Sequence, residues 1–186
     1  MSQPTALNTL LGPPRRVLPD DWQTMPWRNG GGVTHELLKL GEGAQGFALR
    51  ISVAEVTADG PFSRFEGVDR TILLLSGAGM TLTWPGGDRT HLTRATPRLS
   101  FPGEVALQSA LIDGPTTDLN VMVDRATLQA EVSLAVPGEI TAPLIFLLRA
   151  GQVNGEALPA HTLLVRPGRV ACDAPMVAIS VNVHDG

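Results

Sequence analysis

The sequence predicts an all-β protein, built as a sandwich or a barrel. Three observations support this prediction. Short apolar or alternating runs recur along the chain, 20 glycines and 15 prolines separate them, and segments with helical periodicity are scarce. A chain of 186 residues buries a substantial core, either as one domain or as two small packed halves.

Each predicted strand is an apolar or alternating run that ends at a glycine, a proline or a polar turn. In chain order these runs are FALRISVAEV (47–56), RTILLLSG (70–77), MTLTW (80–84), RLSFPG (98–103), EVALQSALI (104–112), LNVMV (119–123), LIFLLR (144–149), HTLLVRPG (161–168) and MVAISVNV (176–183). Their length and their apolar and β-branched content are typical of strands. The best helix candidate, DRATLQAEV (124–132), is short.

The order of these runs repeats once. The segment ILLLSGAG (72–79) followed by LSFPG (99–103) resembles LIFLLRAG (144–151) followed by LLVRPG (163–168). The first copy is longer, by about the length of the extra turn PGGDRTH (85–91). The repeat predicts one β unit that is used twice. Chance reuse of a common β pattern stays open as the alternative.

Composition and charge narrow the class of protein. The net charge is −4 and the pI is near 5.5, the opposite of the basic footprint of a nucleic-acid binder. Cys172 is the only cysteine, which excludes intrachain disulfides and zinc sites built from several cysteines. We expect neither a signal peptide nor a transmembrane helix, because no basic start precedes an apolar stretch and no apolar run is long enough. The expected location is cytoplasmic.

Three predicted strands carry polar side chains on one face. Alternate side chains of a strand point to opposite faces. The residues concerned are Arg50, Ser52, Arg70 and Asn120. This face is either exposed to water or lines the interior of a small barrel that holds one ligand. The polar groups are mixed with Ile, Leu, Met and Ala rather than with Lys and Glu, which favours the interior. A buried arginine needs a partner, and a carboxylate ligand would pair it bidentately.

Two connecting segments add aromatic residues and glycines. Phe62 and Phe65 of PFSRFEGVDR (61–70) either plug the end of a barrel or cover a flat ligand. The stretch PWRNGGGVT (26–34) lacks the lysine of a Walker phosphate loop. It is either a glycine-rich turn with a partly buried tryptophan, or a backbone cradle for an anion. In the second case Trp27, Arg28 and Asn29 stand at the rim.

No catalytic or metal-binding signature is evident. The histidines have no ligand spacing: His35, His91, His161 and His184. No Gly-x-Ser-x-Gly elbow is present. Asp69 is either a base or, as we favour, the partner of an arginine in a salt bridge. We therefore predict no metal, no cofactor and no catalytic residue.

Four long strings resemble the HutD/Ves family. They are MPWRNGGGVTHE (25–36), RISVAEVTADGPFSRFEGVDRTILLLSGAGMTL (50–82), LSFPGE (99–104) and LIDGPTTDLNVMV (111–123). The resemblance implies a cupin fold, an RmlC-like jelly roll with two cupin-like halves, in agreement with the repeat. We expect residues 1–125 to form the half that carries the pocket and residues 126–186 a smaller half. Exchange of strands between the halves stays open.

The resemblance also implies a function. Family members are encoded with histidine-utilisation genes or described as stress-induced, and the HutD branch is associated with binding a small acid such as urocanate or a formylated glutamate and with limiting pathway expression. Most metal-binding cupins carry His-x-His, then Glu, then a later His. The corresponding segments FSRFEGVDRT (62–71) and VALQSAL (105–111) contain no histidine. Sheet-edge pairing into a homodimer is common in this fold.

Together these observations predict a bicupin that binds a small carboxylate in its first barrel. Arg50 or Arg70 would pair the carboxylate, while Ser52 and Asn120 would add hydrogen bonds. Aromatic side chains would cover the apolar part of the ligand. The predicted ligand-binding residues are Trp27, Arg28, Asn29, Arg50, Ser52, Phe62, Phe65, Arg70 and Asn120. The expected partner is this carboxylate, with neither nucleic acid nor membrane.

Two other functions stay open. One is a metal-independent isomerase or hydrolase that acts on a small organic acid, with Asp69 or His35 as proton carrier. The other is a structural or protein-interaction module whose own side chains fill the polar interior.

Overall fold

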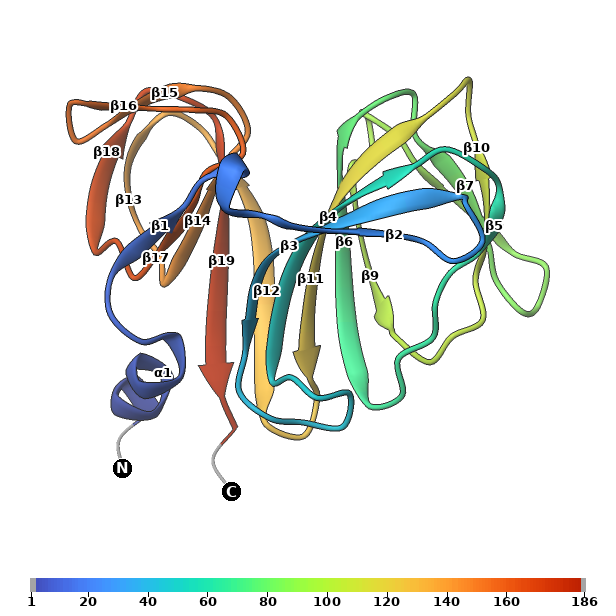
Figure 1. Ribbon diagram of the computed structural model, residues 1–186, viewed down its shortest axis with the longest axis horizontal. Helices are drawn as coiled ribbons and strands as arrows, with labels where there is room; N and C mark the ends of the chain where they lie inside the picture. The colour runs from blue at the N-terminus through green and yellow to red at the C-terminus, as the bar shows by residue number, and fades with distance from the viewer. Residues whose placement is uncertain (1–2, 185–186) are drawn as a thin grey trace. The chain divides into compact units, whose positions relative to one another are not determined.

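The computed structural model describes residues 3–184, which form two compact units (Figure 1). One unit consists of residues 23–126, and the other combines residues 3–22 with residues 127–184. The N-terminal residues belong to the second unit because β1 (Arg15–Val17) pairs with β17 (Leu163–Val165). The predicted all-β class is confirmed. Among the described residues only α1 (Gln3–Leu11) and the 3-10 turn η1 (Pro19–Asp21) are helical.

The unit of residues 23–126 contains two antiparallel sheets. The larger has the strand order β2-β3-β4-β11-β6-β9, and the smaller has the order β5-β10-β7-β8. The strands of the larger sheet are β2 (Gln23–Pro26), β3 (Gly32–Leu40), β4 (Leu49–Val56), β11 (Thr116–Asp124), β6 (Val68–Ser76) and β9 (Arg98–Pro102). Those of the smaller sheet are β5 (Gly60–Pro61), β10 (Gln108–Leu111), β7 (Met80–Thr83) and β8 (Arg89–Leu92).

The other unit also contains two antiparallel sheets. Their strand orders are β1-β17-β14-β19-β12 and β13-β18-β15-β16. The strands not yet given are β12 (Leu128–Ala135), β13 (Gly138–Thr141), β14 (Leu144–Leu147), β15 (Gly151–Val153), β16 (Glu156–Leu158), β18 (Arg169–Cys172) and β19 (Met176–Val183). Apolar side chains from both sheets pack together in its interior, including Ile145, Leu147, Val153 and Val170.

The two units share one strand order. The series β4-β11-β6-β9 of one unit corresponds to β12-β19-β14-β17 of the other, and β5-β10-β7-β8 corresponds to β13-β18-β15-β16. Each of these eight strands of residues 23–126 thus corresponds to the strand eight places later along the chain. The two apolar segments of the sequence repeat lie on corresponding strands, since residues 72–76 are in β6 and residues 144–147 form β14.

The predicted helix at residues 124–132 is wrong. This segment contains the end of β11, a turn, and the start of β12. Leu128, Ala130 and Val132 recur at every second position, and β12 pairs with β19 along its whole length. Tertiary pairing therefore decides the structure of a segment whose local helix signal is weak. Within residues 3–184, no helix has the length and apolar character needed to cross a membrane.

Candidate functional site

A cavity of about 460 Å³ lies in the unit of residues 23–126. Its volume is within the range of small-molecule sites, about 300–1,000 Å³. Side chains from β3, β4, β6, β10 and β11 line it, together with the segments 26–31 and 58–65. The structure brings all nine residues predicted from the sequence to this one cavity: Trp27, Arg28, Asn29, Arg50, Ser52, Phe62, Phe65, Arg70 and Asn120.

Strand alternation explains why the polar side chains meet there. On β4, Arg50 and Ser52 line the cavity, whereas Leu49 and Ile51 are buried on the opposite face. The register of the sheet places Ser52 opposite Asn120. Local periodicity and one strand pairing therefore align polar groups from β4 and β11 on the same wall.

Arg50 already has one protein partner. Its Nε donates to Glu36 Oε2 at 2.7 Å, and both side chains are largely buried. The register places Glu36 opposite Ser52, which explains why the two side chains meet. Among the described residues, no acceptor binds the terminal nitrogens of Arg50 or the hydroxyl of Ser52. Arg50 is thus anchored on one side and open to the cavity on the other.

Arg70 is enclosed almost completely. Its side chain donates to the Ser63 carbonyl oxygen at 3.0 Å and to Asn120 Oδ1 at 2.6 Å. Three aromatic ring centroids lie 5.2 to 5.3 Å from its Cζ, in cation–π geometry: those of Phe62, Phe65 and Phe101. Burial lowers the pKa of Arg70 to about 10, so the side chain stays protonated at neutral pH. Its buried Nε has no partner among the described residues.

Asp118 is a cavity residue that the sequence prediction missed. It is 1% exposed, and its Oδ1 accepts from Asn120 Nδ2 at 2.5 Å. Its buried Oδ2 has no partner among residues 3–184. Burial raises the pKa of Asp118 to about 7, although Arg70 and Asn120 act in the opposite direction. The sequence pattern could have identified Asp118, because it precedes Asn120 by two residues and strand alternation places both side chains on one face.

Residues 27–31 form the turn between β2 and β3, and Gly32 begins β3. Gly30 N–H donates to the Trp27 carbonyl oxygen at 3.0 Å, and Gly31 N–H donates to Asn29 Oδ1 at 3.0 Å. These two N–H groups are therefore used inside the turn, so the hypothesis of a free anion cradle is wrong for them. At Gly32, a Cβ would lie 2.4 Å from the backbone oxygen of Glu55. This glycine permits close approach of two strands.

Two of the rim residues have different environments. Trp27 is half-buried, donates from Nε1 to Thr34 Oγ1 at 2.8 Å, and packs against an apolar cluster of this unit. Arg28 is exposed and makes no hydrogen bond or ion pair with the described residues. With Arg50 and Arg70, Arg28 gives the cavity three cationic side chains.

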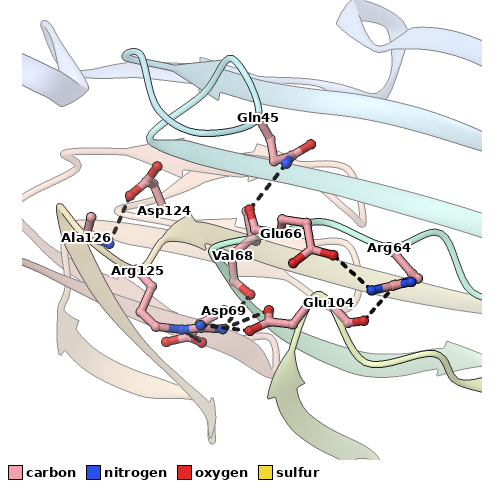
Figure 2. Close-up of polar contacts among 9 residues, drawn as sticks. All are labelled: Gln45, Arg64, Glu66, Val68, Asp69, Glu104, Asp124, Arg125 and Ala126. Carbon is pink, nitrogen blue, oxygen red and sulfur yellow. Dashed lines mark hydrogen bonds and ion pairs between the residues drawn. The ribbon is translucent and has the colours of Figure 1, made fainter.

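The proposed proton carriers Asp69 and His35 do not line the cavity. Arg125 Nε donates to Asp69 at 2.6 Å, which confirms the predicted salt bridge, and the same guanidinium binds Glu104 at 2.9 Å (Figure 2). The hydrogen bond from Arg125 lowers the pKa of Glu104. His35 instead contacts Thr24 and Glu55. No group of three or more His, Cys, Asp or Glu side chains that could hold a metal gathers within the described part of the chain.

Comparison with known proteins identifies the family. The HutD family model matches residues 19–160. An uncharacterised 21.2 kDa protein in the hutC 3′ region of Pseudomonas putida is 38% identical over 103 residues, which cover 55% of this chain and 54% of that protein. Protein Ves of Cronobacter sakazakii is 33% identical over 147 residues, which cover 74% of this chain and 80% of Ves.

Solved structures agree with this assignment. HutD from Pseudomonas fluorescens SBW25 (formate condition) has a TM-score of 0.81 at 28% identity, with 93% of this chain and 100% of that chain covered. A cupin 2 conserved barrel domain protein from Leptotrichia buccalis has a TM-score of 0.54 at 9% identity, covering 87% and 96% of the two chains, a likeness of fold alone. The protein has a cupin-type β fold and belongs to the HutD/Ves family.

Proposed function

We propose that this protein binds a small carboxylate in the cavity of residues 23–126 and thereby modulates histidine utilisation or a stress response. The observation that carries the proposal is the Arg50 guanidinium. Glu36 fixes its Nε, Arg50 lines the cavity, and its terminal nitrogens have no acceptor among the described residues. These nitrogens are not among the fully buried side-chain atoms that lack a partner, so they remain accessible, and a carboxylate would accept hydrogen bonds from both at once.

The corresponding unit supports this interpretation by contrast. It has the same strand order, and the apolar side chains of Leu147, Leu158, Leu164 and Met176 pack in its interior. The strand order therefore does not require polar residues between the sheets. We propose that the two units are the cupin-like halves of a bicupin, of which only the half at residues 23–126 carries a carboxylate site.

The names of the relatives favour acids of histidine utilisation as ligands. They include HutD and a protein of the hutC 3′ region. Urocanate and N-formylglutamate each combine a carboxylate with a second polar group. The indole of Trp27 and the rings of Phe62 and Phe65 line the same cavity and would contact the rest of such a ligand.

Isothermal titration calorimetry with urocanate, N-formylglutamate, glutamate and formate tests the proposal. We expect at least one acid to bind the wild-type protein. Arg50→Met should weaken its binding at least tenfold, because a hydrogen bond to a charged group contributes about 1.5–3 kcal/mol. Arg89→Met makes the same change at an exposed arginine on β8 outside the cavity, and its affinity should equal that of the wild type.

Thermal unfolding without ligand establishes that both variants fold. Unchanged affinity in Arg50→Met would contradict the assignment of Arg50. Failure of every acid to bind or to raise the unfolding temperature of the wild-type protein would contradict a carboxylate site.

One observation favours a second function, a metal-independent isomerase or hydrolase. Asp118 is a buried cavity carboxyl with a pKa near 7, as expected of a general acid or base. Incubation of the same acids with the protein, followed by mass spectrometry, distinguishes turnover from binding. A product that forms with the wild-type protein and is absent with Asp118→Asn would establish the enzyme.

A further inference from the structure

Three buried side chains form a hydrogen-bonded series across the cavity wall. Arg70 donates to Asn120 Oδ1 at 2.6 Å, and Asn120 Nδ2 donates to Asp118 Oδ1 at 2.5 Å. The exposed fractions are 6% for Arg70, 4% for Asn120 and 1% for Asp118. The series ends at Asp118 Oδ2, which is buried and has no partner among residues 3–184. A polar atom with this degree of burial calls for a partner that the protein does not supply.

The surroundings of Asp118 favour its neutral form. In register, Asp118 lies between Ala54 on β4 and Leu74 on β6, both apolar and buried. No cation forms an ion pair with it among the described residues. The other charged groups that line the cavity are Arg28, Arg50, Asp59 and Arg70, and Glu36 neutralises part of the charge of Arg50. An anion bound at Arg50 adds a negative charge to the same cavity, which further favours protonation of Asp118.

Asp118 and Arg50 are separated along the sheet. Arg50 is opposite Met122, and Asp118 lies four residues from Met122 on β11, about 13 Å along the strand. The bond from Arg50 to Glu36 draws the guanidinium toward the level of Ser52 and Asn120, which shortens this separation. A single carboxylate group is too small to contact both side chains. A ligand with two polar groups several bonds apart would reach both.

We propose that the cavity selects carboxylates that carry a second hydrogen-bond acceptor, with the carboxylate at Arg50 and the second group receiving a hydrogen bond from Asp118 Oδ2. This inference rests on the proposed carboxylate-binding function and specifies its ligand class. Asp118 is then a specificity-determining residue. When the Asp118 carboxyl is protonated, Oδ2 donates a hydrogen bond. When the carboxyl loses this proton, Oδ2 is only an acceptor and repels a carbonyl oxygen.

Levulinate and valerate are the probes for this inference. Both are five-carbon carboxylates, and levulinate has a ketone oxygen where valerate has a methylene group. Binding is followed by two-dimensional NMR of the indole N–H of Trp27, which lines the cavity. At about pH 6 the wild-type protein should bind levulinate about three- to tenfold more tightly than valerate, the contribution of one hydrogen bond. At about pH 9, with Asp118 ionised, this preference should disappear.

Two variants separate the hydrogen bond from the fold. Asp118→Asn retains a donor that does not titrate, so the preference for levulinate should persist at both pH values. Asp118→Leu has no donor and should show equal affinities at both. Equal affinities in the wild-type protein at about pH 6, or a preference that survives in Asp118→Leu, would overturn the inference. Binding of both probes without preference would leave the proposed function intact. No binding of either probe would overturn this inference, while the proposed function would still be decided by the titrations with urocanate, N-formylglutamate, glutamate and formate.

Discussion

Asp118→Asn provides a direct test of the buried carboxyl on β11. This carboxyl has an ordinary pKa of 3.8, and burial in the folded protein raises its pKa to about 7. The folded state therefore holds the proton more tightly than the unfolded state does. The resulting contribution to stability is complete below about pH 4, decreases as the pH rises, and is lost above about pH 7. Asparagine does not titrate, so the variant lacks this dependence.

The size of the effect follows from the interval between the two pKa values. One pH unit within it corresponds to about 1.4 kcal/mol, so the full interval corresponds to about 4 kcal/mol. Between about pH 5 and about pH 8 the accessible part is about 3 kcal/mol. Over this range the free energy of unfolding of the variant, relative to that of the wild-type protein, should rise by this amount.

Urea unfolding followed by tryptophan fluorescence at a series of pH values measures this difference. Two of the three tryptophans, Trp27 and Trp84, belong to the unit of residues 23–126, which contains Asp118, whereas Trp22 belongs to the other unit, so two of the three fluorophores report on the unit of interest. Asp88→Asn makes the same change at an exposed residue of that unit and serves as the comparison. A wild-type-to-variant difference that stays constant within about 1 kcal/mol would refute the reasoning, because Asp118 would then be ionised in the folded protein.

Three further predictions concern stability. Gly32→Ala should lower the free energy of unfolding by about 2 kcal/mol, because the added Cβ would meet the backbone oxygen of Glu55. Gly30→Ala should lower it by about 1 kcal/mol, because Gly30 has φ +70° but open space around a Cβ. Equal losses in urea titrations of the two variants would contradict the steric argument. Arg125→Ala should lower it by less than about 1 kcal/mol, since the side chain is 40% exposed, and a measured loss above about 2 kcal/mol would contradict this. Phe146→Ala empties a fully buried position in the other unit and should lower it by about 3–5 kcal/mol, measured by calorimetry; a loss below about 1 kcal/mol would show that the site collapses.

Some of the site follows from local sequence alone. The side-chain direction along a strand has a period of two residues, so the sequence by itself places Arg50 and Ser52 on one face and Leu49 and Ile51 on the other. The same rule, continued two residues back from Asn120, includes Asp118. The β class and the family resemblance can likewise be read from the sequence, because each rests on short continuous segments of the chain.

What each polar group contacts depends on the tertiary structure. Glu36 meets Arg50 only because β3 and β4 pair in one particular register, and Arg70 meets Asn120 across 50 residues of chain. Phe62 and Phe65 lie around the Arg70 guanidinium and also line the cavity, whereas the terminal nitrogens of Arg50 have no acceptor among the described residues. The sequence by itself determines which residues share a face of a strand, because side-chain alternation is local. Only the tertiary structure decides which of them are already paired, because pairing depends on the distance between strands that are far apart in the chain.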